Sequence, residues 1–278
     1  MNTVNTQPLI GSLALAAVAW ITASGTVIPL QAGEMTAQEL QGKRIYERVC
    51  ATCHGRNGDG KGPAADALDP RPRDFTSGLF KFSTTASGVQ PLDSDLIRTV
   101  SEGVPGSWMP DWKHHLDRDE IAAAVSYIKL FSDAFDEEMY EEDIFSLSPE
   151  RPAEFPSSSE SAASGRLLYV KNQCAECHGE SGRGDGPSAG THIDSWGQPI
   201  MPPNLRYGVF RGGARPEDLF RTLKTGLGGT PMPAYGEILP DEELWQLVDY
   251  VISLRSTKKW RSYVRSAPTW EDADQGRR

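Results

Sequence analysis

The cysteines of this chain occur only in two short motifs, each of which also contains a histidine. The 278-residue sequence holds four cysteines, two in CATCH (Cys50–His54) and two in CAECH (Cys174–His178). Cysteine and histidine at such close spacing can form a redox-active disulfide, bind zinc or, as Cys-x-x-Cys-His, attach a haem. Other parts of the sequence decide among these three chemistries.

Zinc and redox chemistry both require residues that the sequence does not supply. A structural zinc site takes four ligands and each motif offers three, so a further Cys or His is needed. His192 is the one candidate after the second motif, and no residue corresponds to it after the first. A thioredoxin-type redox pair would need alternating strand and helix patterns around it, and none is visible.

The motif is the attachment signature of a c-type haem. On a helix, positions i, i+3 and i+4 share one face, so both sulfurs can form thioethers with a haem while the imidazole binds its iron. We therefore expect two covalently bound haem c groups. The expected attachment residues are Cys50, Cys53, Cys174 and Cys177, and the expected proximal iron ligands are His54 and His178.

The two motifs belong to a tandem repeat that covers most of the chain. Gly42–Gly55 resembles Gly165–Gly179 with one inserted residue, and Asp95–Pro110 aligns with Asp218–Pro233 without a gap. Self-similarity of this kind indicates duplicated structural units. Each unit is therefore expected to hold one haem.

Each repeat also carries a Met-Pro pair in a glycine-bounded loop. Met109 and Met232 occupy matching positions, at similar distances along the chain from their histidines. A thioether is a soft ligand that favours ferrous iron, and we expect these methionines to be the sixth iron ligands. An alternative for the first haem is ligation by His114 or His115, which have no equivalent in the second repeat.

Helices have to position these residues, because no segment shows the sustained alternation of a strand. In each repeat the pattern predicts a helix that ends in the cysteine motif, a short helix and a last amphipathic helix, separated by Gly/Pro loops. The expected helices are 37–53, 94–102 and 117–131 in the first repeat, and 162–177, 216–225 and 240–254 in the second. The fold class is therefore all-α, with a few helices and long loops wrapped around each haem.

With these features the sequence resembles the class I cytochromes c, and in particular dihaem members such as cytochrome c4. The resemblance rests on Gly-x-x-x-Tyr before Cys-x-x-Cys-His, on the late Met-Pro loop and on a tyrosine in the last helix. It implies that the first and last helices of each domain cross, near Gly42 and Tyr127 and near Gly165 and Tyr250.

The same resemblance implies further contacts around each haem. A backbone carbonyl in the loop after the motif, within 72–75 or 202–205, would accept a hydrogen bond from the proximal imidazole. Lys81 and Arg211 stand at matched places and would either neutralise haem propionates or remain solvated.

The chain therefore divides into five expected segments. They are a signal peptide or N-terminal membrane anchor (1–32), cytochrome c domain 1 (33–131), an acidic linker (132–160), cytochrome c domain 2 (161–260) and a tail (261–278). Residues 9–30 are apolar and long enough to span a bilayer, and a cleavage point follows Ala32. Either outcome places the haem domains outside the cytoplasm.

Charge is unevenly distributed along the chain. Most of the net charge of −10 lies between Asp133 and Glu160, and the remainder of the sequence is close to neutral. A protein that binds nucleic acid through a basic surface would show the opposite pattern, so we expect no nucleic-acid partner.

Two axial ligands on each iron would leave no vacant position for a substrate. We therefore expect an electron-transfer protein rather than an enzyme: a periplasmic dihaem c-type cytochrome that carries single electrons between redox protein partners. The alternative is a membrane-anchored dihaem subunit of a respiratory oxidase or dehydrogenase complex. A dihaem enzyme such as a peroxidase is less favoured, since its iron has to open.

Overall fold

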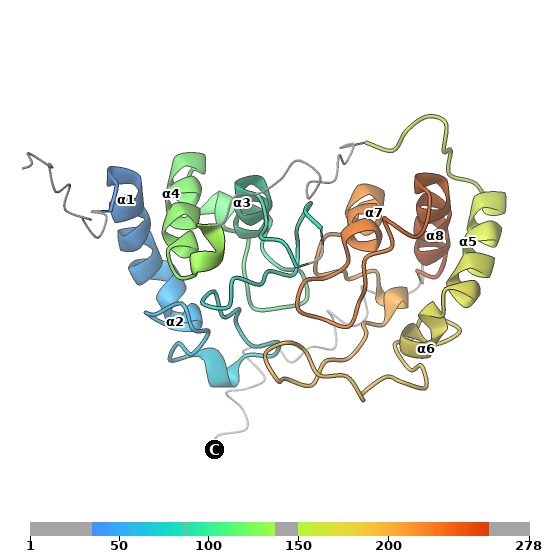
Figure 1. The fold of residues 1–278 in the computed structure, drawn as a ribbon, viewed down its shortest axis with the longest axis horizontal. Coiled ribbons are helices and arrows are strands. Elements are labelled where there is room, and N and C mark those ends of the chain that lie inside the picture. Colours follow the sequence, from blue (N-terminus) through green and yellow to red (C-terminus); the bar gives the residue numbers. More distant parts are fainter. Residues whose placement is uncertain (1–34, 87, 137–149, 256–278) are drawn as a thin grey trace, which may run out of the picture. The chain divides into compact units, whose positions relative to one another are not determined.

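The computed structural model describes residues 35–86, 88–136 and 150–255. Within these ranges the regular elements are helices (Figure 1), and Ile193 and Pro199 form an isolated antiparallel bridge. The expected all-α fold class is therefore confirmed. No helix in the described ranges is both long and apolar enough to cross a membrane. The expected leader or anchor (1–32) and the tail (261–278) lie outside the described residues.

Three helices frame the first repeat: α1 (Ala37–Ile45), α3 (Asp93–Glu102) and α4 (Arg118–Lys129). The cysteine motif lies on two short elements, the π-helical η1 (Tyr46–Cys50) and α2 (Ala51–His54). The single helix expected over 37–53 is thus widened before the motif, as π-turns at functional sites often are. The 3₁₀ turns of this half are η2 (Ala65–Ala67), η3 (Trp112–His114) and η4 (Asp133–Phe135).

The second repeat has the same helix order. Its elements are α5 (Ser159–Lys171), α6 (Cys174–His178), η6 (Leu205–Tyr207), α7 (Pro216–Thr225) and α8 (Asp241–Ser253). Here the helix expected over 162–177 is broken, because Gln173 adopts a left-handed conformation with φ 58°. The break takes up the one residue by which this repeat is longer between its tyrosine and its first cysteine.

Side chains that bond to free backbone amides fix where the helices begin. At the start of α1, the Thr36 hydroxyl accepts a hydrogen bond from the Glu39 amide (3.2 Å), and the Glu39 carboxylate accepts one from the Thr36 amide (2.6 Å). Asp117 and Glu120 form the same reciprocal pair before α4 (2.8 and 3.0 Å). Such capping boxes satisfy amides that a helix start leaves without partners.

Glycines allow the first and last helices of each repeat to cross closely. A Cβ on Gly42 would lie 1.9 Å from the Ala123 carbonyl oxygen of α4, and a Cβ on Gly165 would lie 1.9 Å from the Gln246 carbonyl oxygen of α8. The same glycines face the Cβ atoms of Tyr127 and Tyr250. The crossings implied by the resemblance are therefore confirmed.

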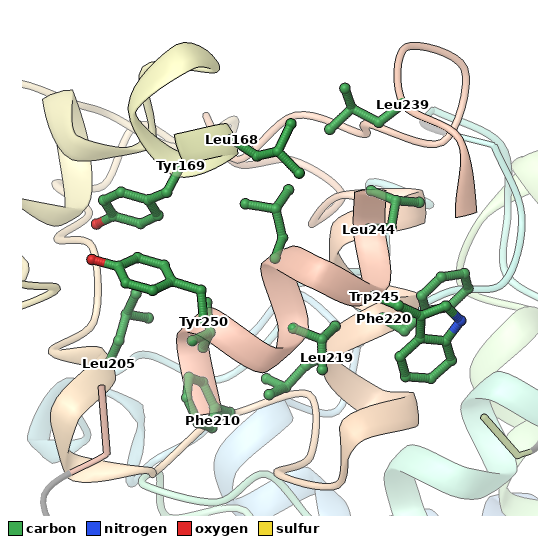
Figure 2. Packing of buried hydrophobic residues seen from close by; sticks show 13 residues of the cluster. Leu168, Tyr169, Leu205, Phe210, Leu219, Phe220, Leu239, Leu244, Trp245 and Tyr250 are labelled. Carbon is green, nitrogen blue, oxygen red and sulfur yellow. The ribbon is translucent and has the colours of Figure 1, made fainter. Parts of the chain in front are cut away.

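The apolar cores of the two halves differ in continuity. In the second half a single buried cluster extends from α5 across α7 to α8, with Phe220 stacked on Trp245 at 4.3 Å between ring centroids (Figure 2). In the first half the buried residues form two clusters, and Phe80 packs against both. The cavity described below is lined by members of both clusters.

The end of the expected acidic linker is anchored on the second half. Arg151 forms a two-pronged ion pair with Asp249 of α8 (2.6 and 2.8 Å), and the guanidinium also covers the Trp245 ring. The hydroxyls of Ser157 and Ser161 donate hydrogen bonds to the same carboxylate. The segment around Arg151 is therefore packed rather than freely solvated.

Candidate haem sites

None of the four cysteines forms a disulfide, and the surroundings of Cys50 and Cys174 do not favour thiolates. Burial raises the pKa of Cys50 to about 12, and the nearby Cys53 contributes to the rise. Burial also raises the pKa of Cys174. A redox-active cysteine needs the opposite shift, so these environments disfavour thiol–disulfide chemistry and suit thiols that are attached covalently to a group.

The proximal histidine of the first site is held by its own half of the chain. Nδ1 of His54 donates a hydrogen bond to the Arg73 carbonyl (3.0 Å), and the imidazole stacks on Phe75 with 4.5 Å between ring centroids. Burial lowers the pKa of His54 and outweighs the rise due to the hydrogen bond. A neutral imidazole with Nδ1 engaged leaves Nε2 as the iron-binding atom.

His178 has matching surroundings, with a weaker contact at Nδ1. Burial lowers its pKa, and the nearby Pro203 carbonyl partly opposes that shift. The Nδ1 atom is buried yet makes no hydrogen bond of normal geometry. The carbonyls of Arg73 and Pro203 thus come from the loops 72–75 and 202–205 implied by the resemblance, although the sequence did not indicate which residue of each loop would be used.

Tyrosines and glycines lock the motif helix in the same way in both halves. The Tyr46 hydroxyl donates a hydrogen bond to the Gly55 carbonyl (2.7 Å), and Tyr169 donates one to the Gly179 carbonyl (2.7 Å). The chain then folds back, and the Gly60 amide donates to the His54 carbonyl (2.9 Å). The motif residues that recur in the same order in both repeats therefore form the same local structure in both halves.

Both methionine loops are closed by the same pair of hydrogen bonds. The Met109 amide donates to the Ser107 hydroxyl (3.1 Å), and the Met109 carbonyl accepts from the Val104 amide (3.0 Å). In the second loop Thr230 and Leu227 make the equivalent bonds to Met232 (both 3.2 Å). Sequence reasoning missed these hydroxyl groups, and a Ser or Thr two residues before each methionine was the available signal.

The first half encloses a cavity that joins the expected ligands. Cys50, Cys53 and His54 line it together with Met109, and its other walls are largely apolar. An imidazole nitrogen and a thioether sulfur on a largely apolar cavity suit a haem iron with its flat, apolar macrocycle. Among the described residues no group of three or more Cys, His, Asp or Glu side chains is placed to hold a metal ion such as zinc.

Cationic side chains gather at the rim of this cavity. Arg73 and Lys81 come from the first repeat, and Arg211 comes from the second. Burial lowers the pKa of Lys81 to about 8, and repulsion from Arg73 and Arg211 adds to the effect, while Asp194 opposes it. This excess of positive charge fits an anionic group, such as haem propionates, at the rim.

The cavity of the first half is not lined by His114, His115, His192 or the additional methionine Met201. His114 is exposed and lies beside Asp111, with 3.4 Å between Nε2 and Oδ2, and His115 is exposed as well. His192 lies near a motif, with Nε2 3.4 Å from the sulfur of Cys177. Met201 is 59% exposed. Of these residues, only His192 contacts a predicted haem-binding residue in the described structure.

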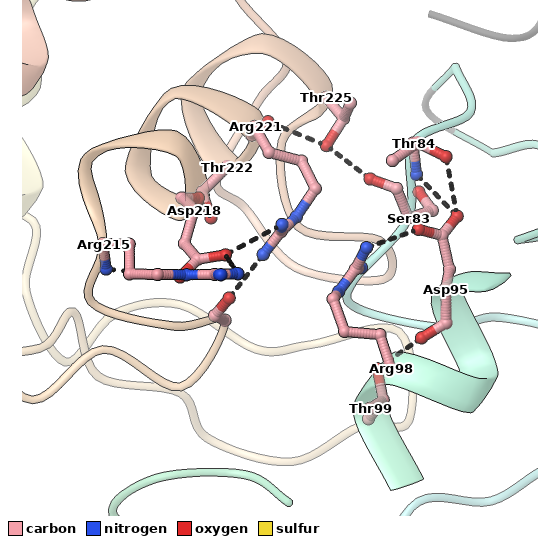
Figure 3. Close-up of polar contacts among 11 residues, drawn as sticks. Ser83, Thr84, Asp95, Arg98, Thr99, Arg215, Asp218, Arg221, Thr222 and Thr225 are labelled. Atoms are coloured by element: carbon pink, nitrogen blue, oxygen red, sulfur yellow. Dashed lines mark hydrogen bonds and ion pairs between the residues drawn. The ribbon is translucent and has the colours of Figure 1, made fainter. Parts of the chain in front are cut away.

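The two halves contact each other where α7 and the loop after it meet the segment before α3. The Thr225 hydroxyl donates a hydrogen bond to the Ser83 carbonyl (3.0 Å), and beside it Asp95 and Asp218 each pair with an arginine three residues later on the same helix (Figure 3). The Gly228 amide also donates to the Lys81 carbonyl (3.3 Å). No local sequence pattern predicts these contacts, because the partners are distant along the chain.

A family model matches both repeats. It is described as cytochrome c oxidase, cbb3-type, subunit III, and it covers residues 37–128 and 160–251. Curated relatives include the cbb3-type cytochrome c oxidase subunit FixP of Azorhizobium caulinodans, which is 25% identical over 79% of this chain. The subunit CcoP of Azospirillum brasilense is 27% identical over 78% of this chain. The chain spans about three fifths of the length of these two relatives (61% and 62%).

A solved structure matches over more of its own length. A chain of the reducing HAO-like protein complex of Kuenenia stuttgartiensis is 40% identical in sequence and superposes with a TM-score of 0.73. The match covers 80% of this chain and 98% of that chain.

Proposed function

Because the chain belongs to the family of cytochrome c oxidase, cbb3-type, subunit III, we propose that it is the electron-transferring subunit of an oxidoreductase complex. It is a dihaem c-type cytochrome with two covalently bound haem c groups, and its role lies in electron transport. The observation that carries the subunit proposal is its similarity over 98% of a chain that was solved within a multiprotein complex. A freely moving periplasmic carrier, which the sequence first suggested, is less well supported.

The repeated motifs support an assignment of the residues that would hold the two haems. A c-type haem supplies an iron that gains or loses one electron. In the first site Cys50 and Cys53 would form the thioethers, and His54 and Met109 would bind the iron, because all four residues line the same cavity. The corresponding residues of the second site are Cys174, Cys177, His178 and Met232.

This arrangement favours electron transfer over substrate chemistry. The hydrogen bond from Nδ1 fixes the orientation of the His54 imidazole, and burial favours its neutral form. The Met109 amide donates to the Ser107 hydroxyl and the Met109 carbonyl accepts from the Val104 amide, so the loop is held closed with Met109 at the cavity wall. An iron bound by both His54 and Met109 would have no ligand position left for a peroxide or another substrate.

The proposed location is outside the cytoplasm, at the membrane that carries the partner complex. The apolar segment 9–30 is expected to direct export or to anchor the chain. The surface beside the first cavity would face the redox partner, because Trp108, which lines the cavity next to Met109, is 71% exposed.

Native extracts and the purified protein test this proposal. In size-exclusion chromatography of gently solubilised membranes and soluble extract, we expect the haem c signal of this chain to elute with a larger redox protein. Elution as a free monomer from both extracts would contradict the subunit role. In addition, the reduced protein should not bind carbon monoxide, because stoichiometric binding would reveal an open iron and refute electron transfer through two closed sites.

A further inference from the structure

The second repeat contains a loop, 191–200, that has no counterpart in the first. A hydrogen bond from the Asp194 amide to the Gln198 carbonyl (2.9 Å) joins the two sides of this loop. Trp196 lies at the turn, where its amide donates to the Asp194 carboxylate (3.0 Å). The loop therefore presents an ordered indole ring, and the haem-site assignments give this ring no role.

One side of the Trp196 indole contacts the first haem site. The Arg73 guanidinium lies over the ring, with its central carbon 3.4 Å from the ring centroid, and Nε1 donates a hydrogen bond to the Ser77 hydroxyl (3.2 Å). Arg73 is also the residue whose carbonyl accepts the hydrogen bond from His54. Only one residue therefore separates Trp196 from the proximal histidine of the first site.

The edge of the same ring contacts the methionine loop of the second site. A Cβ on Gly229 would lie 2.2 Å from an atom of the indole, so only glycine allows this approach. The neighbouring Ser195 amide donates a hydrogen bond to the Gly229 carbonyl (2.9 Å). Gly229 belongs to the loop that the bond between Leu227 and Met232 closes.

We propose that Trp196 is a positioning residue for electron exchange between the two haems, because it holds the proximal loop of the first site and the methionine loop of the second in one fixed arrangement. The inference rests on the proposed function. In the exchange one electron leaves a ferrous iron and reduces the other, ferric iron. No bond forms or breaks and no proton moves.

The contacts of Trp196 suit this role better than general packing of the two halves. A residue that only stabilised the fold would not need to touch the ligand-bearing loops of both sites. The hydrogen bond from Thr225 to Ser83 already joins the halves elsewhere. Loss of Trp196 should therefore alter the relative placement of the two sites while the repeats remain folded and loaded with haem.

The test measures electron exchange in full-length protein loaded with both haems. A brief pulse of reductant adds one electron per molecule, and absorption then follows its redistribution between the haems. We expect Trp196→Leu to slow this redistribution about tenfold, which corresponds to roughly 1.4 kcal/mol. Trp196→Phe keeps an aromatic ring against Arg73 but loses the bond to Ser77, and it should give an intermediate rate.

The control is Tyr207→Leu, which removes an aromatic side chain that is 73% exposed in the same half. It should exchange electrons at the wild-type rate. Unchanged haem spectra in each variant show that the iron ligands remain in place, and the Phe variant answers the question if the Leu variant does not fold.

The outcomes separate the inference from the proposed function. A wild-type rate in Trp196→Leu and Trp196→Phe, with native haem spectra, would refute the role of Trp196 and leave the electron-transfer function intact. If the wild-type protein itself shows no exchange between its haems, both the positioning role and a function that uses the two haems in series are wrong.

Discussion

The hydroxyl of Tyr46 donates a 2.7 Å hydrogen bond to the carbonyl of Gly55, and so ties the end of the first helix to the residue that follows His54, the proposed iron ligand. Tyr46 is fully buried. Without this hydroxyl, the Gly55 carbonyl would lose a bond that water cannot easily replace.

Tyr46→Phe should therefore lower the free energy of unfolding by about 1–3 kcal/mol. Chemical denaturation of the haem-loaded protein measures the change. The matched control is Tyr127→Phe, which alters a neighbouring tyrosine whose hydroxyl has no hydrogen bond in the described structure. Equal effects of the two substitutions would show that the bond to Gly55 contributes nothing specific.

Gly42→Ala should force α1 away from α4, because the added methyl group would overlap the Ala123 carbonyl. Overpacking of this kind costs roughly 1–3 kcal/mol. Thermal unfolding should show the loss, whereas Gln38→Ala on the exposed side of the same helix should change little. A Gly42→Ala protein as stable as the wild type would mean that the helices do not cross as closely as the structure shows.

Met109→His and Met232→His test the proposed axial ligands. An imidazole in place of a thioether should lower the potential of the altered haem, because methionine ligation raises it. Redox titration combined with absorption spectra measures this for each site. Met201→Leu, which alters an exposed methionine, is the control. The ligand assignment fails if neither substitution lowers a potential.

Lys81→Gln should lower the potential of the first haem, because the loss of a positive charge at the cavity rim stabilises the ferric state. The expected shift is on the order of tens of millivolts, where 59 mV is a tenfold change in the equilibrium constant for one electron. Lys61→Gln removes an exposed lysine of the same half and should leave the potential unchanged. Equal shifts in the two variants would show that Lys81 has no specific effect on the potential of the first haem.

The carboxyl group of Asp249 should make the free energy of unfolding depend on pH. Burial alone would raise its pKa, but hydrogen bonds from Arg151, Ser161 and Ser157 outweigh burial, and the net shift is downward. Its contribution is therefore present above the unfolded-state pKa of about 3.9, and it is lost as the pH falls through the lower folded-state value.

Two substitutions check this dependence by denaturation at several pH values. Asp249→Asn should flatten the fall in stability below about pH 4. Arg151→Met should cost about 3–5 kcal/mol near neutral pH, because it leaves a buried carboxylate without its partner. Arg71→Met breaks an exposed ion pair with Asp66 and should cost far less. A comparable loss in both arginine variants would contradict the buried pair.

Local patterns along the chain predicted much of the fold. Periodicity and spacing led to the helices, and the repeat related Cys50 to Cys174 and Met109 to Met232. The helix crossings followed from the resemblance, and the close approach at Gly42 confirms the first of them. These features depend on residues near in sequence or on positions that occur twice.

Two kinds of feature were not predicted: local changes in helix geometry, and contacts between residues that are distant along the chain. The π-turn before Cys50 and the left-handed Gln173 are two ways to fit unequal lengths between tyrosine and cysteine, and composition does not distinguish them. The position of Trp196 against Arg73 depends on how the halves meet. A repeat reveals what the halves share, whereas these contacts involve residues that differ between them.

Because of the loop 191–200, the two halves of the chain are not interchangeable. A chain assembled from two copies of the first half would keep both cysteine motifs and both methionine loops, but it would have no indole to lie on Arg73. A chain with the halves exchanged in order would have to re-create that contact across a new junction. The two copies are therefore no longer equivalent. The contact between Trp196 and Arg73 depends on the order in which the copies follow one another.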